Sequence, residues 1–269
     1  MLFLAQIRRH AALLGAYFTQ YAKVRMSYRA DFFISLATSM AATIFSLAFV
    51  YVLFQRIQGL SQWSKHEIFF LYGFSLIPFG LFNVLSLNLY EFGNTYIIEG
   101  KFDRVLLRPI SSLFQVLFET FRIESLHEVV AGFVIVVWAS RELGHHWRLL
   151  DIALLAFFGL CGGIIYISVF LLLSTVSFLF EDRIGVHPPF WNLLAFGRYP
   201  LSIYSGYIQF LLSWIIPFGF ATFYPSARLL GRAEFRSYAP LIPLVAAAIL
   251  AVALASWRLG TRRYSSTGS

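Results

Sequence analysis

The feature that most constrains this chain is a set of long apolar blocks, each about the length of a membrane-spanning helix. About 20 helical residues cross a hydrocarbon core of roughly 30 Å. Suitable blocks occur at about 32–54, 68–92, 113–139, 152–180, 201–224 and 239–257. The pattern predicts an all-α polytopic membrane protein with six transmembrane helices.

Composition excludes a soluble domain of the same length. Of the 269 residues, 59% are hydrophobic and only 13% are charged, and the mean hydropathy is +0.72. Soluble domains carry roughly 25% charged residues. Lipid is therefore expected to cover much of the surface. The single cysteine, Cys161, cannot form a disulfide or a metal framework within one chain.

The distribution of basic residues predicts that both termini are cytoplasmic. In that orientation the cytoplasmic segments hold 14 of the 21 Lys and Arg residues, including Arg198 in the loop between spans four and five. The seven outside are Arg56, Lys65, Arg141, Arg148, Arg228, Arg232 and Arg236. The last three recur every four residues, which indicates a short interfacial helix with one basic face. Attraction of lipid headgroups or substrate is the alternative reading.

Residues 1–30 are predicted to form an N-terminal amphipathic interfacial segment. One face collects apolar residues, which are Leu4, Ile7, Ala11, Leu14 and Phe18. Such a helix lies in the plane of the membrane surface, with its basic side toward anionic headgroups. The alternative is a poorly ordered basic tail. No small-residue cleavage site follows a compact apolar core, so we expect the segment to be retained.

The loop between spans two and three breaks the apolar pattern with the stretch "IIEGKFDRVLLRPISSLFQVLFE". We predict that span two ends in a left-handed conformation at Gly93 and Asn94. The segment 101–109 then reads as a short amphipathic helix that Pro109 stops. A capping box of Ser112 and Gln115 is predicted to start the next helix. Viewed without relatives, this short helix has a purely structural explanation at the membrane surface.

At this point the chain resembles the type-2 permeases of ATP-binding-cassette exporters. The resemblance is carried by "EGKFDRVLLRPISSLFQVL", "WIIPFGFATFYPSARLL" and the ending "WRLGTRRYSSTGS". It extends over nearly the whole chain and is nearest to daunorubicin-resistance-type and viologen-exporter-type permeases. It implies a six-span permease domain at 31–260 and a cytoplasmic tail at 261–269.

The resemblance further implies that the loop carries a coupling helix, which seats in a groove of a separate ATPase subunit. The matching residues here are Gly100, Phe102, Asp103, Arg104, Leu107, Arg108 and Pro109. In this interpretation Phe102 and Leu107 are apolar anchors, and the charged residues pair with the rim of the groove. ATP and magnesium are expected in that partner, and no cofactor is expected in this chain.

Charged residues are densest in the predicted third span. They are Glu119, Arg122, Glu124, His127 and Glu128. They form either a cytoplasmic extension of the helix or a polar patch in the conduit or at a partner interface. Glu124 and Glu128 would be a like-charge pair on one helix face, which needs a cation or a raised pKa if buried.

Glycine and proline residues mark two further features. Gly159 and Gly163 allow close helix approach, either within the chain or between two permeases. Pro217, Gly219 and Pro225 predict broken helix, and the resemblance implies a short re-entrant region between spans five and six. Aromatic residues are abundant there, and interfacial belts and packing explain most of them. The alternative is a lining for amphipathic or flat cationic substrates.

The sequence lacks a phosphate-binding "GxxxxGK[ST]" motif, a zinc-protease motif and a "GxSxG" nucleophile motif. We therefore predict a non-enzymatic permease of the cytoplasmic membrane that exports an amphipathic, drug-like or lipid-linked substrate. The expected partners are ATP-binding subunits, membrane lipid and a second permease, with a heterodimer favoured, and no nucleic acid. The competing readings are an ion-gradient-driven secondary transporter, which should show inverted repeats, and a non-transporting scaffold.

Overall fold

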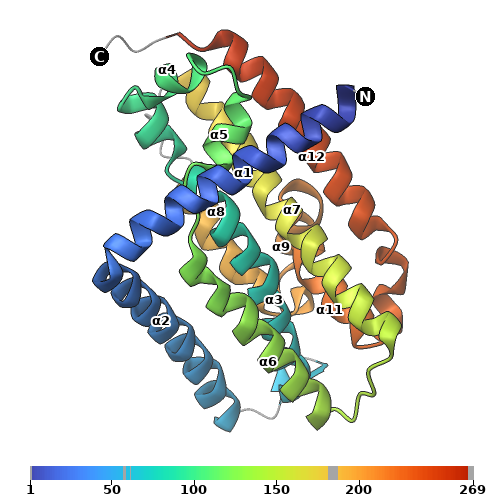
Figure 1. Cartoon of the computed structure of the whole chain (residues 1–269). Coiled ribbons are helices and arrows are strands. Elements are labelled where there is room, and N and C mark those ends of the chain that lie inside the picture. The colour runs from blue at the N-terminus through green and yellow to red at the C-terminus, as the bar shows by residue number, and fades with distance from the viewer. Residues whose placement is uncertain (1, 57–58, 61, 181–186, 266–269) are drawn as a thin grey trace.

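The computed structural model describes residues 2–56, 59–60, 62–180 and 187–265 (Figure 1). Almost all of them are helical, and a two-residue antiparallel pair joins β1 (Gly59–Leu60) to β2 (Trp63–Ser64). The α-helices are α1 (Leu2–Ser27), α2 (Arg29–Arg56), α3 (Lys65–Ser86), α4 (Lys101–Leu106), α5 (Ser112–Phe118), α6 (Leu126–Glu142), α7 (Leu149–Phe180), α8 (His187–Leu193), α9 (Gly206–Phe210), α10 (Phe218–Ala221), α11 (Phe223–Leu229) and α12 (Leu241–Arg263).

Short 3₁₀ and π segments link these helices. In chain order they are Leu87–Leu89, Gly93–Ile98, Ile123–Ser125, Leu194–Arg198, Leu201–Ile203, Leu211–Ile215 and Ala233–Tyr238. Several lie directly against an α-helix and extend it.

Five helical stretches within the described residues are long and apolar enough to cross a membrane. They are Arg29–Gln55, Lys65–Ile98, Ile123–Glu142, Leu149–Phe180 and Ala233–Arg263. A sixth span is present if Gly206–Ile215 and Phe218–Leu229 count as one, although they are bent by 71°. The prediction of a helical polytopic protein is therefore confirmed, with five to six spans.

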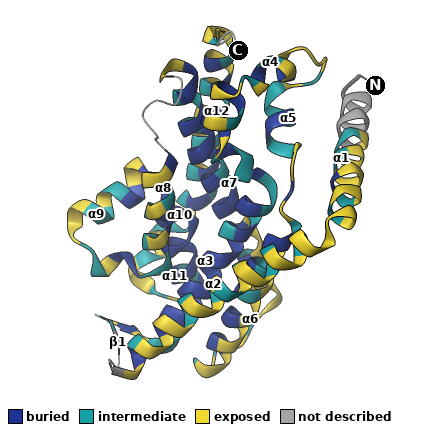
Figure 2. Ribbon diagram, turned by 90° about the vertical axis from the view of Figure 1, so that its left-hand side faces the viewer, coloured by how far each residue is buried: buried dark blue, intermediate teal, exposed yellow. Residues whose placement is uncertain are grey.

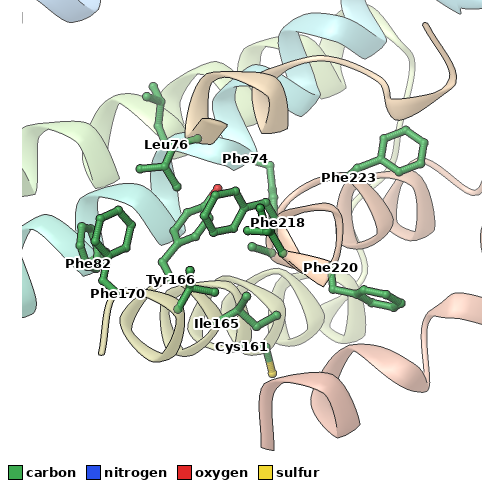
Figure 3. Close-up of a cluster of buried hydrophobic side chains, with 14 of the residues drawn as sticks. Phe74, Leu76, Phe82, Cys161, Ile165, Tyr166, Phe170, Phe218, Phe220 and Phe223 are labelled. Atoms are coloured by element: carbon green, nitrogen blue, oxygen red, sulfur yellow. The ribbon is translucent and has the colours of Figure 1, made fainter. Parts of the chain in front are cut away.

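The centre of the bundle is α3, which packs against α6 and α7, while α12 lies along α7 (Figure 1). Its core is aromatic: Phe82 lies 4.7 Å from Phe170, and Tyr166 lies 5.2 Å from Phe218, measured between ring centroids (Figure 3). Close approach depends on glycine. A Cβ at Gly132 of α6 would lie 2.6 Å from the carbonyl oxygen of Gly73, so the α3 and α6 backbones touch there.

The predicted glycine contact on α7 also lies within the chain. A Cβ at Gly162 would meet the carbonyl oxygen of Ala221, and one at Gly159 would lie 3.0 Å from the Ile77 side chain. Gly163 has more room, with Leu81 at 3.4 Å. The tightest approach is thus at Gly162, where α7 meets both α3 and α10.

In contrast to α3, α2 lies at the edge of the bundle (Figure 1). Only 6% of its most apolar window is buried, compared with 78% for the span that begins with α3. Large apolar side chains such as Phe33, Phe45 and Phe49 are exposed along it, and Figure 2 colours much of the α2 ribbon as exposed. An apolar helix exposed on most of its sides must be covered by lipid or by another protein.

The predicted third span is not one continuous helix. Helix α5 ends at Phe118, residues 119–122 are non-helical, and α6 begins only after a 3₁₀ turn. The backbone N–H of Arg122 donates a hydrogen bond to the carbonyl of Val84 on α3, at 3.2 Å. The predicted helical spacing of Glu119 with Arg122 is therefore wrong, because the chain leaves the helix at Glu119.

The predicted basic stripe of Arg228, Arg232 and Arg236 is also wrong. Gly231 lies between the first two with φ of 75° and ends α11, so the three side chains do not share one helix face. Arg232 instead binds Glu67 at the start of α3, through two hydrogen bonds of 2.9 and 2.8 Å. Its guanidinium also lies 4.6 Å from the Trp63 ring centroid. We call Trp63, Glu67 and Arg232 the α3-start clamp.

Candidate functional site

The first candidate site is α4, which lies at the end of the bundle opposite the α3-start clamp and close to the C-terminal end of α12 (Figure 1). The left-handed residue before it is Gly100, with φ of 69°. Left-handed backbone favours glycine because it has no Cβ. The predicted left-handed end of span two at Gly93 and Asn94 is wrong, because a π-helix runs from Gly93 to Ile98.

Phe102 is fully buried inside the chain. Its ring lies 5.0 Å from Phe178, 4.9 Å from Tyr264 and 5.8 Å from Phe92, with Trp257 at 6.0 Å. We call these five rings the aromatic box. The predicted anchoring of Phe102 in a partner's groove does not fit this position, since the side chain already fills the space between α4, α7 and α12.

A hydrogen bond joins α4 to the C-terminal end of the described chain. The Tyr264 hydroxyl donates to Oδ1 of Asp103 at 3.0 Å. Burial, together with the hydrogen bond to the Asp103 carboxylate, raises the pKa of Tyr264 to about 12. Asp103 thus faces its own chain, although it was predicted to face a partner's rim.

The turn from α4 to α5 is fixed by Gln115, which is buried. Its Nε2 donates hydrogen bonds to the carbonyl oxygens of Val105 at 2.9 Å and Ile110 at 3.0 Å. Ser112 accepts from the Trp257 indole at 3.2 Å. The predicted capping box does not form, since Ser111 occupies the N-cap and makes no side-chain cap. Gln115 reaches back, as expected, but to the carbonyl of Val105 in α4 and to that of Ile110 after it.

The outer surface of α4 and its turn carries apolar and basic side chains. Leu107 is 84% exposed and Leu106 is 47% exposed. Around them lie Lys101, Arg104 and Arg108, all exposed, and Pro109 is exposed as well. Lys101 pairs with Glu99 at 2.9 Å. We call Lys101, Arg104, Leu106, Leu107 and Arg108 the α4 tip. It is a positively charged projection with an exposed leucine pair, held from behind by the aromatic box.

The second candidate site is the polar cluster between α1 and the start of α6. Arg25 binds Glu124 at 2.7 Å and Asp31 at 2.9 Å. Tyr21 donates to Glu124 at 3.2 Å and accepts from Arg25 at 2.7 Å. Glu124 is buried, so the pairing compensates for its desolvation. The hydrogen bond to Tyr21 and the charges of Glu124 and Asp31 raise the pKa of Arg25 against the opposing effect of burial.

Glu128 has separate partners. It is buried and accepts a hydrogen bond from Asn83 of α3 at 2.8 Å. His127, which lies between the two glutamates in the chain, has its Nδ1 at 2.7 Å from the carbonyl oxygen of Glu124. Its Nε2 lies 3.2 Å from the Thr43 hydroxyl of α2. The two glutamates therefore do not form one like-charge site, because one is bound to α1 and the other to α3.

The rest of the predicted polar patch lies beside a cavity of about 600 Å³ between α1 and residues 119–122. Glu119 accepts a hydrogen bond from Tyr96, and Arg122 is exposed at the cavity wall. The predicted amphipathic face of residues 3–30 lies partly outside the described side chains, which begin at residue 12. Within the described part, Tyr21 and Phe18 pack against Phe121 at 6.0 and 5.9 Å.

The predicted re-entrant residues lie at the 71° bend. Pro217 precedes α10 and separates it from the π segment Leu211–Ile215. A Cβ at Gly219 would meet the Leu201 side chain at 2.7 Å. Pro225 does not break a helix, because it lies in the first turn of α11, where a missing N–H costs no intrahelical bond.

Arg198 is a further residue whose position differs from the prediction. It was counted in a cytoplasmic loop, but its guanidinium lies 5.7 Å from the ring centroids of both Tyr72 and Phe79, in the middle part of α3. The signal that could have found it is its surroundings, "NLLAFGRYPLSIY", which is too apolar for an ordinary exposed loop. Among the residues that the structure describes, no group of three or more His, Cys, Asp or Glu is placed to hold a metal.

A bundle with five to six apolar spans and a basic projection at one end defines a multi-pass helical membrane protein. Residues 40–268 match the family described as ABC-2 family transporter protein, and the chain belongs to that family. Members are membrane subunits of ATP-binding-cassette transporters and typically work with an ATP-binding subunit. No curated protein and no solved structure matches the chain.

Proposed function

We propose that this chain is the permease subunit of an exporter and that the α4 tip is where an ATP-binding subunit contacts it. The observation that carries the proposal is an exposed leucine pair and three basic residues on α4 and the turn that follows it, while the inner face of α4 is packed against the bundle. Interfaces concentrate binding energy in apolar anchors surrounded by a polar rim. Leu107 supplies the anchor here, and Arg104 and Arg108 supply the rim.

Rigidity behind the contact supports a mechanical role for α4. The aromatic box links α4 to α7 and α12, and Gln115 links it to α5. A displacement of α4 is therefore transmitted to two long helices without bending the tip itself. ATP and magnesium would be bound by the partner, and this chain would respond to closure of that partner.

The proposal includes an orientation and an assembly. The α4 tip, the C-terminal end of α12 and the N-terminal end of α1 lie toward one end of the bundle (Figure 1), which we assign to the cytoplasm. The exposed α2 is the face that we assign to lipid and to a second permease, in a heterodimer. The transported substrate would be amphipathic, drug-like or lipid-linked.

The experiment is to purify the chain together with the ATP-binding subunit encoded beside its gene, reconstitute both in lipid, and measure ATP hydrolysis. We expect association and stimulated hydrolysis. The double variant Arg104→Gln with Arg108→Gln should lose most of the stimulation. Its matched control is Arg141→Gln with Arg148→Gln, which removes two exposed charges at the opposite end. Absence of association, or equal loss in both double variants, contradicts the proposal.

A further inference from the structure

Arg198 is a charged side chain placed against the middle of the bundle. Tyr72 is the eighth and Phe79 the fifteenth residue of the 22-residue α3, and both rings face its guanidinium. The preceding residue, Gly197, would meet Thr222 and the Tyr166 hydroxyl if it carried a Cβ. Tyr166 is central in α7. The segment 194–198 thus enters the bundle midway between its ends, where α8 and α9 lie in Figure 2.

Arg198 has no ion-pair partner among the described residues. Glu128 is an acidic residue near enough to interact electrostatically with Arg198. It is hydrogen-bonded to Asn83, however, and makes no ion pair with the arginine. Arginine stays protonated in proteins. Two aromatic faces attract the cation without neutralising it. A charge at this depth is costly and is typically retained for a ligand or an ion pathway.

A cavity of about 330 Å³ opens beside this arginine. Its walls include Phe45, Ser46 and Phe49 of α2, and Tyr72, Arg198 and Tyr199 on the bundle side. The Tyr72 hydroxyl is buried and lacks a hydrogen bond of normal geometry to the described residues, although Ser46 is near enough to interact with it. The cavity therefore combines a cation without an ion-pair partner among the described residues, three hydroxyl-bearing side chains and two phenylalanine rings.

We infer that this cavity binds the anionic group of an amphipathic substrate. The anion would lie against the Arg198 guanidinium and accept from the Tyr72 hydroxyl, and the apolar part would lie along Phe45 and Phe49. A planar guanidinium with two parallel N–H donors fits carboxylate and phosphate groups. The size is at the lower end for small-molecule sites, so it accommodates the head of an amphiphile and leaves the tail toward lipid.

This inference rests on the proposed function, because it assigns a substrate class to the permease. It depends on α2 as the outer wall. Since α2 is otherwise so little packed, a shift of α2 would open the cavity sideways at the cost of few contacts, among them the His127–Thr43 hydrogen bond. The site is therefore placed where an amphiphile could enter from the membrane.

The test measures binding to the full chain, alone, in nanodiscs of zwitterionic lipid. The probes are radiolabelled decanoate, decanol and decyltrimethylammonium, which share a chain length and differ in charge. We expect the anion to bind at least about tenfold more tightly than the other two. Arg198→Gln should remove this preference, and Arg198→Lys should retain part of it. Arg236→Gln, which removes an exposed charge that does not line the cavity, should leave this preference unchanged.

A second variant tests the cavity independently, in case Arg198→Gln does not fold. Ser46→Phe fills the cavity from α2 and leaves Arg198 in place, so it should reduce decanoate binding while thermal unfolding stays near that of the wild type. Equal binding of all three probes, or a preference for the cation, overturns the inference. Because the ATP-binding subunit is absent from this assay, a failure here leaves the proposed coupling intact. Likewise, if the chain does not associate with that subunit, the probe-binding measurement can still be interpreted.

Discussion

The two ends of the bundle use the same residue types in opposite ways. At the α3-start clamp, Arg232 is bound by Glu67 and covered by Trp63, so its charge is neutralised within the chain. At the α4 tip, Arg104 and Arg108 point outward and the aromatic residues lie inside. The first arrangement closes an end of the fold. The second leaves charge and apolar surface available for a partner while the support stays rigid.

The largest expected effect comes from removing the support of the tip. Phe102→Ala deletes the central ring of the aromatic box and should lower the free energy of unfolding by about 3–5 kcal/mol, through lost burial and a residual cavity. Denaturant unfolding of the purified chain in detergent measures this. Leu106→Ala, on the same helix but half exposed, should cost less than about 1 kcal/mol. Similar losses in both variants would mean that the box does not hold α4.

The clamp at the other end should show the next largest effect. Arg232→Ala leaves Glu67 without its charged donor and should cost about 2 kcal/mol, since both side chains are partly shielded from solvent. Arg236→Ala is the control, and we expect it to stay within about 0.5 kcal/mol of the wild type. In a double-mutant cycle, adding Glu67→Gln to Arg232→Ala should recover most of the lost unfolding free energy. If the effects of the two single variants simply add, the pairing is contradicted.

At the α4 tip we expect weaker binding without weaker folding. Leu107→Ala should reduce affinity for the ATP-binding subunit by about 1–2 kcal/mol, which is roughly five- to thirtyfold. Titration of the reconstituted permease with that subunit gives the affinity. Leu149→Ala is a matched control, because Leu149 at the start of α7 has the same exposed fraction of 84%. A stability loss in Leu107→Ala would place this leucine in the fold instead of the interface.

The smallest effect is expected for the hydrogen bond that closes the box. Tyr264→Phe removes the donor to Asp103 and should cost about 1 kcal/mol. The pH dependence has a defined sign. Because the folded pKa of Tyr264 is raised from 10.0 to about 12, the folded state keeps a proton that the unfolded state loses. Stability from this group is therefore present below pH 10 and falls between pH 10 and 12. Tyr264→Phe should reduce that alkaline loss.

Long apolar blocks predicted the spans well because burial in lipid depends on composition along one helix. The second and fourth spans lie within Lys65–Ile98 and Leu149–Phe180. Breaks were harder to predict. The end of α5 at Phe118 has no proline or glycine to signal it, and the break is accompanied by a tertiary hydrogen bond from the backbone N–H of Arg122 to the carbonyl of Val84.

The sites show the same division between local and tertiary information. The short α4 and the stop near Pro109 follow from local sequence, whereas only the family resemblance predicts that Leu107 faces outward. The burial of Phe102 could not be predicted, because its partners on α7 and α12 lie more than 70 residues away. Arg198 was misplaced for a similar reason. Its sequence position is between spans, but α8 and the segment 194–198 return to the middle of the bundle.

The four non-helical residues between α5 and α6 have a mechanical consequence. On one side, α4 and α5 are tied together through Gln115 and to α12 through Trp257. On the other, α6 and α3 touch backbone to backbone at Gly132 and Gly73. Residues 119–122 are the non-helical connection between these two packed units, so we expect any movement of α4 and α5 relative to α3 and α6 to be taken up there. Shortening this connection should restrict that relative movement while leaving both units intact.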